Sequence, residues 1–289
     1  MKQNDDFKLV ITSEHKLFDL HLKEVIEYKD LIKLFIKRDF TALYKQTILG
    51  PAWAIIQPLF TTIVFSIIFG DLAHLSTADT SDNYIIPAFL FYMAGNICWS
   101  YFSGALHTIG DTFNNNAHIM GKVYYPRLVT PIAVALSKTI SFAIQFVLFV
   151  VVWLFYLIKG GTSLSITPAL LLLPLTVIQI IVLALGCGII ISSFTTKYKD
   201  LNFAITFCLQ LWQYATPIAY GLSLVPDKYI LLYMLNPVTP IITTFRYAMF
   251  GFGYFNLTFY LISWAITLFL FFIGVVLFSK VERTFADTI

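Results

Sequence analysis

Side chains able to act as acids, bases or metal ligands are few in this chain, and they do not gather. Asp111 with two nearby histidines is the nearest approach to a catalytic group. No HExxH pair is present, and no spacing typical of zinc ligands. The sequence therefore predicts neither a catalytic centre nor a metal site in this chain. The histidines are His15, His21, His74, His107 and His118.

A phosphate-binding loop is also missing. The pair Gly121-Lys122 lacks the glycine that such a loop needs before it, and Val123 stands where Ser or Thr is required. Any ATP hydrolysis would therefore take place on a separate subunit. The formal charge of +3 is too small to indicate a nucleic-acid partner.

Ionisable groups are nearly absent from the long apolar segments. Ion-coupled carriers place Asp or Glu at mid-membrane depth, whereas the acidic residues here stand at segment ends. Lys138 is a cation well inside such a segment. Two interpretations of Lys138 remain open: it contacts a phosphate or a neighbouring helix, or it extends to the cytoplasmic interface as lysines near membranes do.

The elements that would position these residues are membrane helices. Hydrophobic residues make up 58% of the 289 residues and charged residues only 12%, which a soluble domain of this size does not show. A bilayer-crossing helix needs about 20 apolar residues. The predicted fold is an all-α polytopic membrane protein with six transmembrane helices, at roughly 52–70, 85–110, 128–158, 168–193, 203–221 and 257–279.

The apolar stretch 229–250 is interrupted and is not counted as a span. Asn236-Pro237 and Pro240 break it, and Arg246 places a charge in its second half. We interpret it as two short helices meeting at 236–240 and entering the membrane from one side. Such re-entrant backbone is tolerated only where protein or a water-filled cavity covers it.

Charge placement indicates the orientation. With six spans both termini share a side, and the loops on that side hold Lys122, Arg127, Lys197 and Lys199, followed by the basic C-terminal tail. The positive-inside rule then places both termini in the cytoplasm. The expected organisation is a cytoplasmic segment over 1–50, a transmembrane domain over 51–279 and a cytoplasmic tail over 280–289. Residues 22–45 have apolar positions near helical spacing and predict an amphipathic helix in the interface plane.

Aromatic residues are abundant in the first, second and fifth predicted spans. Trp and Tyr collect at membrane interfaces and Phe faces lipid well, so these rings are explained by the bilayer alone. They also suit a channel, because flat rings stack against sugar faces without fixed bonds. The candidates for lining a substrate channel are Trp53, Phe60, Phe89, Tyr92, Trp99, Tyr101, Phe207, Trp212 and Tyr214.

Several runs resemble the permease subunits of bacterial type-2 ABC exporters for lipid-linked polysaccharides, the family of O-antigen, capsule and teichoic-acid exporters. They are RDFTALYKQTILGPAWAIIQPL at 38–59, YYPRLVTPIAVALS at 124–137, KYKDLNFAITFCLQLWQYATPIAYGLSLVP at 197–226, LNPVTPIITTFRYAMFG at 235–251, and VERTFADTI at the C-terminus. They follow the family's order and cover most of the chain after residue 26.

The resemblance implies a homodimer paired with two copies of an ABC ATPase, which would hold the ATP and Mg²⁺. It implies that the interfacial helix and the loop 111–127 contact that ATPase. The coupling candidates in the loop are Asp111, Asn115, His118, Lys122 and Tyr125. It further implies a channel lined by spans one, two and five, and short periplasmic gate helices between spans five and six. The gate candidates are Asn236, Pro237, Pro240 and Arg246.

The function that the sequence predicts is export of a polyprenyl-diphosphate-linked polysaccharide of the O-antigen type across the bacterial inner membrane. Arg38, Lys45 and Arg127 are candidates for contacting the lipid diphosphate, because cations pair well with phosphate. Positive-inside anchoring or ATPase contact explains each of them equally well. The alternatives are a teichoic-acid or capsule permease, an ion-coupled carrier, and a membrane glycosyltransferase.

Overall fold

The computed structural model describes residues 22–45, 47–73, 86–120, 122–123, 125–160, 162–198 and 200–285, and in these ranges it contains helices and no β-strand. Predictions about residues 1–21 and 286–289, and His74, lie outside the described residues. The α-helices are α1 Leu22–Glu27, α2 Lys29–Tyr44, α3 Trp53–Phe65, α4 Ala88–Gly110, α5 Thr112–Met120, α6 Val129–Lys159, α7 Leu172–Thr195, α8 Leu201–Tyr214, α9 Asp227–Leu235, α10 Val238–Phe250 and α11 Leu257–Phe285. Short helical turns at Gly50–Ala52, Pro168–Leu171 and Leu222–Leu224 precede α3, α7 and α9, and a wider π-helical turn, Ser66–Leu72, extends α3.

Four continuous helical segments among the described residues are long and apolar enough to cross a bilayer. They coincide with the first, third, fourth and sixth predicted spans. They are Gly50–Leu72, Val129–Lys159, Pro168–Thr195 and Leu257–Val281. The all-α membrane fold is thus confirmed, while the count of six spans stays a prediction.

The second and fifth predicted spans differ from these four. Helix α4 has 23 residues, about 34 Å, but carries polar side chains such as Asn96 and His107 along its length. Helix α8 has 14 residues and ends at Tyr214, so its length of about 21 Å falls short of a 30 Å hydrocarbon core. Pro217 explains the early end, because proline disfavours helix in the residue before it and offers no N–H.

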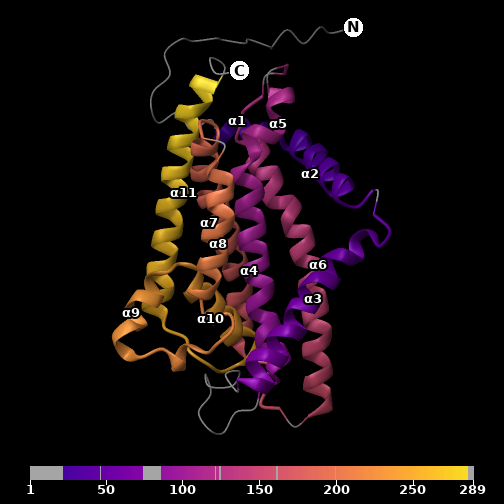
Figure 1. The fold of residues 1–289 in the computed structure, drawn as a ribbon, viewed down its shortest axis with the longest axis vertical. Coiled ribbons are helices and arrows are strands. Elements are labelled where there is room, and N and C mark those ends of the chain that lie inside the picture. Colours follow the sequence, from indigo (N-terminus) through magenta and orange to yellow (C-terminus); the bar gives the residue numbers. More distant parts are fainter. Residues whose placement is uncertain are drawn as a thin grey trace, which may run out of the picture.

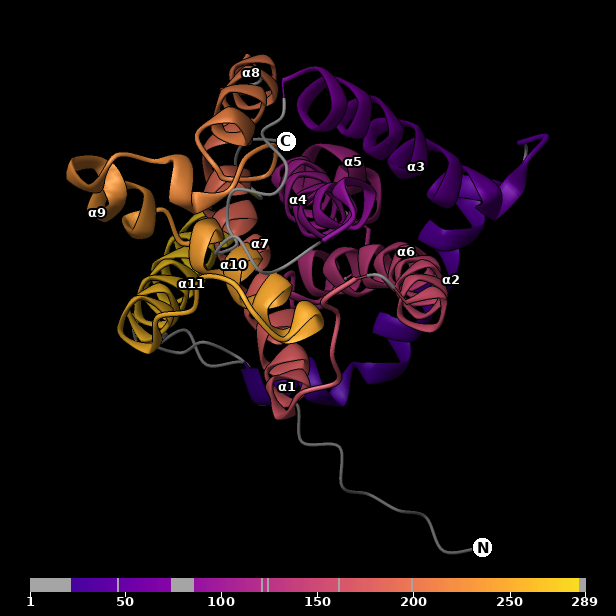
Figure 2. The ribbon, with the colours of Figure 1, turned by 90° about the horizontal axis from the view of Figure 1, so that it is seen from below.

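Helix α4 is the centre of the molecule. It packs against α3, α6, α7, α8 and α10, and Figure 2 shows these helices arranged around it. Every residue from 90 to 99 is buried. The polar residues of α4 therefore lie mostly inside the bundle, and the apolar exterior is supplied by the helices around it.

Helix α7 packs closely against both α4 and α11, and glycines permit the approach. A Cβ added at Gly186 would lie 2.7 Å from the backbone of Phe271 in α11, and one at Gly188 would lie 2.7 Å from Ile109 in α4. Small residues let helix backbones approach in membranes, where packing rather than water drives association. These glycines therefore hold α7 between its two neighbours.

The two ends of the bundle differ. In Figure 1, α1, α5 and the C-terminal end of α11 lie at the top, whereas α9 and α10 lie at the bottom. We refer to these as the α5 end and the α10 end. The stretch 229–250 contains two helices, α9 and α10, which meet at Asn236-Pro237.

The region 22–45 consists of two helices rather than the single one predicted. Helix α1 ends at Glu27, and α2 begins at Lys29 and packs against α6. Val25 and Phe35 are buried, whereas Ile26 is 71% exposed and Leu34 is 60% exposed. The break near Tyr28 rotates the predicted apolar face, so only part of it packs against the bundle.

Candidate functional site

The predicted aromatic residues divide into an exposed set and a buried set. Trp53 and Phe60 on α3 are 48% and 62% exposed, and Phe207 and Tyr214 on α8 are 60% and 66% exposed. Helices α3 and α8 both pack against α4, and Figure 2 shows them on the same side of it. We call these four side chains the aromatic face.

The other predicted channel residues lie behind this face. Tyr92, Trp99 and Tyr101 of α4 are buried in the chain, and Phe89 is half-buried. Their rings contact other side chains of the same molecule: Tyr101 packs edge-on against Phe142 at 5.5 Å, for example. In the single chain these residues therefore support the wall and do not form its surface.

Trp212, half-buried on α8, joins the two sets. Its ring centre lies 5.2 Å from that of Phe102 and 6.3 Å from that of Trp99, both in edge-to-face geometry. Such pairs contribute about 0.5–1.5 kcal/mol beyond the area they bury. The three rings fix the position of α8 against α4.

The junction between α9 and α10 is held by a single amide side chain. The Oδ1 atom of Asn236 accepts hydrogen bonds from the indole N–H of Trp212 at 3.0 Å and from the backbone N–H of Val238 at 3.2 Å. Its Nδ2 atom donates to the Thr216 hydroxyl at 3.0 Å. Asn236 thus forms a side-chain turn with Val238 just before α10 and joins this junction to Trp212 of α8.

We expect Trp212→Phe to preserve the ring packing and to remove the hydrogen bond to Asn236, which should cost about 1 kcal/mol of stability. Trp212→Ala should cost about 3–5 kcal/mol, because it also leaves a cavity. Thermal melting of the purified variants in detergent measures both. Equal losses for the two variants would show that the ring packing contributes nothing.

Arg246, one of the predicted gate residues, is buried on α10 and contacts backbone carbonyls. Its guanidinium donates to the carbonyls of Pro217 and Ile218, each at 2.8 Å, and to that of Phe91 at 3.3 Å. It also lies over the Phe91 ring, 3.6 Å from its centre. Arg246 thereby joins α10 to the turn after α8 and to α4. Pro237 and Pro240 are buried at the start of the same helix.

At the α5 end, the structure brings together the two segments predicted to couple to an ATPase. Phe35 of α2 packs edge-on against Tyr125 at 5.7 Å between ring centres. Arg38 donates to the side-chain oxygen of Asn116 on α5 at 3.1 Å. Asn115, His118 and Lys122 are exposed beside this contact. Residues 22–45 and 111–127 therefore form one surface, which we call the α2–α5 surface.

The predicted diphosphate contacts are in three different environments. Arg38 is paired with Asp39 at 2.8 Å and lies over the Phe35 ring. Lys45 is exposed at the end of α2, and Arg127 is half-buried after Tyr125-Pro126. Their contacts with a lipid diphosphate stay predictions.

Asp111, the acidic residue nearest to a catalytic arrangement in the sequence, is hydrogen-bonded to a residue of α8. Asp111 accepts a hydrogen bond from the side-chain amide of Asn202, at the start of α8, while His107 and His118 are exposed. Within the described part of the chain, no three His, Cys, Asp or Glu side chains gather in a way that would hold a metal ion.

Sequence reasoning missed a polar row on α6. Lys138, Ser141 and Gln145 recur at helical spacing and face a cavity between α2, α3, α4 and α6. The signal was present, because three polar residues at i, i+3 and i+7 in an apolar helix share one side.

Comparison with known proteins identifies the family. The ABC-2 type transporter family matches residues 30–250, which is most of the chain. This chain belongs to the ABC-2 type transporter family. Its structure has the aromatic face on α3 and α8, and the α2–α5 surface lies at the opposite end from α10.

Several members of the family are similar over most of their length. The O-antigen export system permease protein RfbA of Klebsiella pneumoniae is 26% identical over 89% of this chain and 94% of its own. RfbA of Myxococcus xanthus is 25% identical over 78% of this chain and 82% of its own. The polysialic acid transport protein KpsM of Escherichia coli is 26% identical over 76% and 81%.

Proposed function

We propose that this chain is the permease subunit of an ATP-driven exporter that moves a polysaccharide linked to polyprenyl diphosphate out of the cytoplasm. The observation that carries the proposal is the similarity to O-antigen permeases along nearly the whole chain. An O-antigen type substrate is the first candidate. A capsule-type polysaccharide is the second, and the similarity to the polysialic acid transport protein favours it.

The transport path, in this proposal, runs along the aromatic face. Phe60, Phe207 and Tyr214 point outward from a single chain, so one copy offers a wall but no enclosure. A second copy packed face to face would close the path as a homodimer. Rings suit a moving glycan, because they offer sugar faces a broad apolar surface and no fixed hydrogen bond.

The proposed orientation places the α5 end in the cytoplasm. In Figure 1, α2, α5 and the C-terminal end of α11 lie toward that end, and Lys29, Lys33, Lys37, Lys122 and Lys280 belong to these helices or directly follow them. Helices α9 and α10, at the other end, hold only Lys228 and the buried Arg246. The positive-inside rule favours the cytoplasm for the first group. With α4 and α8 counted as the second and fifth crossings, α1 and the end of α11 lie on the same side, as Figure 1 shows for the bundle.

ATP and Mg²⁺ would bind to a separate ABC ATPase in two copies, and the α2–α5 surface would receive its motion. From this surface a series of contacts leads to the α10 end. Asp111 bonds to Asn202 at the start of α8, and Trp212 at the other end of α8 bonds to Asn236. A movement of the α2–α5 surface would thus be transmitted along α8 to Asn236. Helices α9 and α10 would act as the periplasmic gate. The coupling requires that ATP states bind the two conformations with different affinity.

The test is to co-express the chain with ABC ATPases from the same gene cluster and to measure the ATPase activity of the purified complex with added lipid-linked glycan. The informative variant is Phe207→Ala on the aromatic face. Its matched control is Phe269→Ala on α11, which is 63% exposed against 60% for Phe207. We expect glycan stimulation to fall several-fold in the first variant only. Failure of the chain to bind any ATPase would contradict the exporter proposal.

A further inference from the structure

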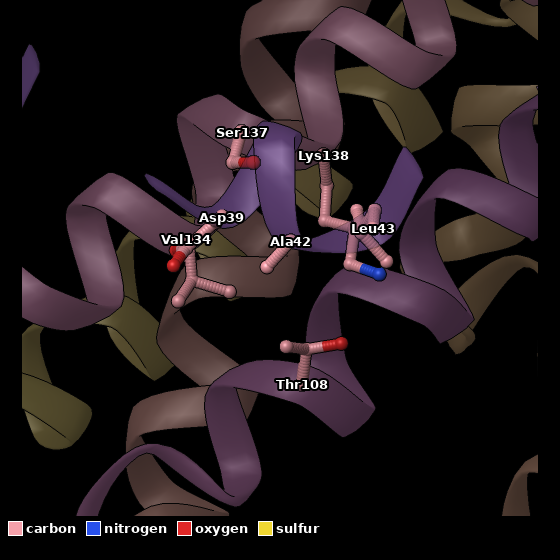
Figure 3. Close-up of a pocket in the computed structure, with 7 residues that line it drawn as sticks. All are labelled: Asp39, Ala42, Leu43, Thr108, Val134, Ser137 and Lys138. Carbon is pink, nitrogen blue, oxygen red and sulfur yellow. The ribbon is translucent and has the colours of Figure 1, made fainter. Parts of the chain in front are cut away.

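A polar cavity lies beside the aromatic residues of α3. It has a volume of about 320 Å³, is lined by residues of α2, α3, α4 and α6, and is open on one side. A second cavity of about 260 Å³ adjoins it, and the two share Leu43 and Lys138 (Figure 3). The first volume lies near the lower limit of small-molecule pockets, which is about 300 Å³.

Lys138 is the only charged residue on the wall of the larger cavity. It stands nine residues into α6, about 14 Å along the helix axis. Among the residues that the structure describes, its ammonium group has no hydrogen bond and no ion pair. A cation at such a depth in an apolar helix normally has a partner.

Asp39 attracts Lys138 through space but forms no ion pair with it. Asp39 lines the smaller cavity, but its Oδ1 atom lies 2.8 Å from the guanidinium of Arg38. In the view of Figure 3, the Lys138 side chain extends past Leu43 toward Thr108, away from the Asp39 carboxylate. The positive charge of Lys138 is therefore left facing the cavity.

The remaining polar groups of the larger cavity suit an anion with several oxygen atoms. Ser100 of α4 and Ser141 and Gln145 of α6 line the cavity and can donate hydrogen bonds, whereas Ser103 already donates to the Trp99 carbonyl at 2.8 Å. Gln145 is only 8% exposed, and its side-chain N–H groups can donate to a phosphate oxygen. Its side-chain oxygen has no partner in the described chain and, being an acceptor, would need a hydroxyl of the ligand.

We propose that this cavity binds the phosphate group of a membrane lipid through Lys138, with Gln145, Ser100 and Ser141 as additional hydrogen-bonding groups. Phosphate is the lipid-borne anion that matches one ammonium group and several neutral donors. A lipid source is favoured because the connection between α2 and α3, next to the cavity, exposes the apolar residues Ile48 and Leu49. These residues would meet acyl or prenyl chains. Binding by the chain itself does not depend on the export function proposed above.

Native mass spectrometry of the full-length protein in detergent tests this site. The probes are phosphatidylglycerol, undecaprenyl diphosphate, a diacylglycerol with the same acyl chains but no phosphate, and inorganic phosphate. We expect either or both phosphate-bearing lipids to bind, with the diacylglycerol at least about ten-fold weaker, since charge-assisted hydrogen bonds are lost. The phosphate-bearing lipid that binds more tightly identifies the source of the headgroup.

The variants assign the binding to the cavity. Lys138→Gln should weaken lipid binding about ten-fold, Lys138→Arg should retain most of it, and Gln145→Leu should weaken it about three-fold. Lys159→Gln, at the exposed end of the same helix, is the matched control and should bind as the wild type does. Thermal melting of each sample identifies any variant that is misfolded.

Three results would overturn the proposal. They are unchanged lipid binding by a folded Lys138→Gln variant, equal binding of the diacylglycerol, and binding of inorganic phosphate without any lipid. If Lys138→Gln does not fold, the Gln145→Leu variant decides, and wild-type binding by that variant would have the same consequence.

Discussion

Gly186→Ala is expected to lower the melting temperature of the purified protein by roughly 5–10 °C. The added methyl group would lie 2.7 Å from the backbone N and Cα of Phe271, so α11 would have to move. Overpacking of a tight contact costs about 1–3 kcal/mol, and each kcal/mol lowers the melting temperature of a chain of this size by about 2–4 °C. Gly274→Ala should behave alike, because its Cβ would meet the Gly186 carbonyl oxygen at 2.7 Å.

Gly104→Ala is the matched control for this effect. Gly104 also lies within a long helix, α4, but nothing lies within 4 Å of the position that its Cβ would take. Alanine favours helix over glycine by about 0.8–1 kcal/mol, so this variant should melt at the wild-type temperature or slightly above it. If Gly104→Ala and Gly186→Ala lose the same stability, the α7–α11 contact is not the cause of the loss.

Arg246→Ala is expected to abolish glycan-stimulated ATPase activity of the complex and to lower the stability of the chain by about 3 kcal/mol or more. The substitution leaves the carbonyls of Pro217 and Ile218 without the donor that binds them, whereas the Phe91 carbonyl keeps its hydrogen bond within helix α4. Each buried carbonyl that loses its partner costs about 1–3 kcal/mol. Helix α10 would then no longer be fixed to the turn after α8.

The comparison of Arg246→Lys with Lys228→Ala separates geometry from charge. Lysine retains the charge but not the planar fork that reaches three carbonyls from one position, so Arg246→Lys should restore little of the stability. Lys228 lies over the Tyr229 ring at the exposed start of α9, and its loss should change melting by less than about 2 °C. Full recovery in Arg246→Lys would mean that charge alone matters at this position.

The aromatic face and the lipid cavity adjoin along α3. Gln57 lines the cavity and shares a side of α3 with Trp53 and Phe60, because the three stand at i, i+4 and i+7. Lys138 and Phe207, by contrast, lie on different helices, α6 and α8. If both proposals hold, Lys138→Gln should weaken lipid binding and Phe207→Ala should weaken the response to glycan.

Much of the fold follows from the order of residues alone. The apolar lengths predicted the four long spans within a few residues of their observed bounds, because a bilayer requires a set length of apolar helix. The break at Asn236-Pro237 was predictable too, since proline acts on its own backbone and on the residue before it. The absence of a P-loop motif and the runs shared with polysaccharide permeases were likewise evident in the sequence.

Tertiary structure decided which residues of the candidate site are exposed. Tyr92, Trp99 and Phe207 are equally aromatic, yet the first two are buried against neighbouring helices and the third is exposed. It also decided that Arg246 binds three carbonyls and that Lys138 faces a cavity without a partner. Helical periodicity states which residues share a side of one helix, whereas the side that faces a neighbour depends on how all the helices pack, through contacts between residues far apart in the sequence.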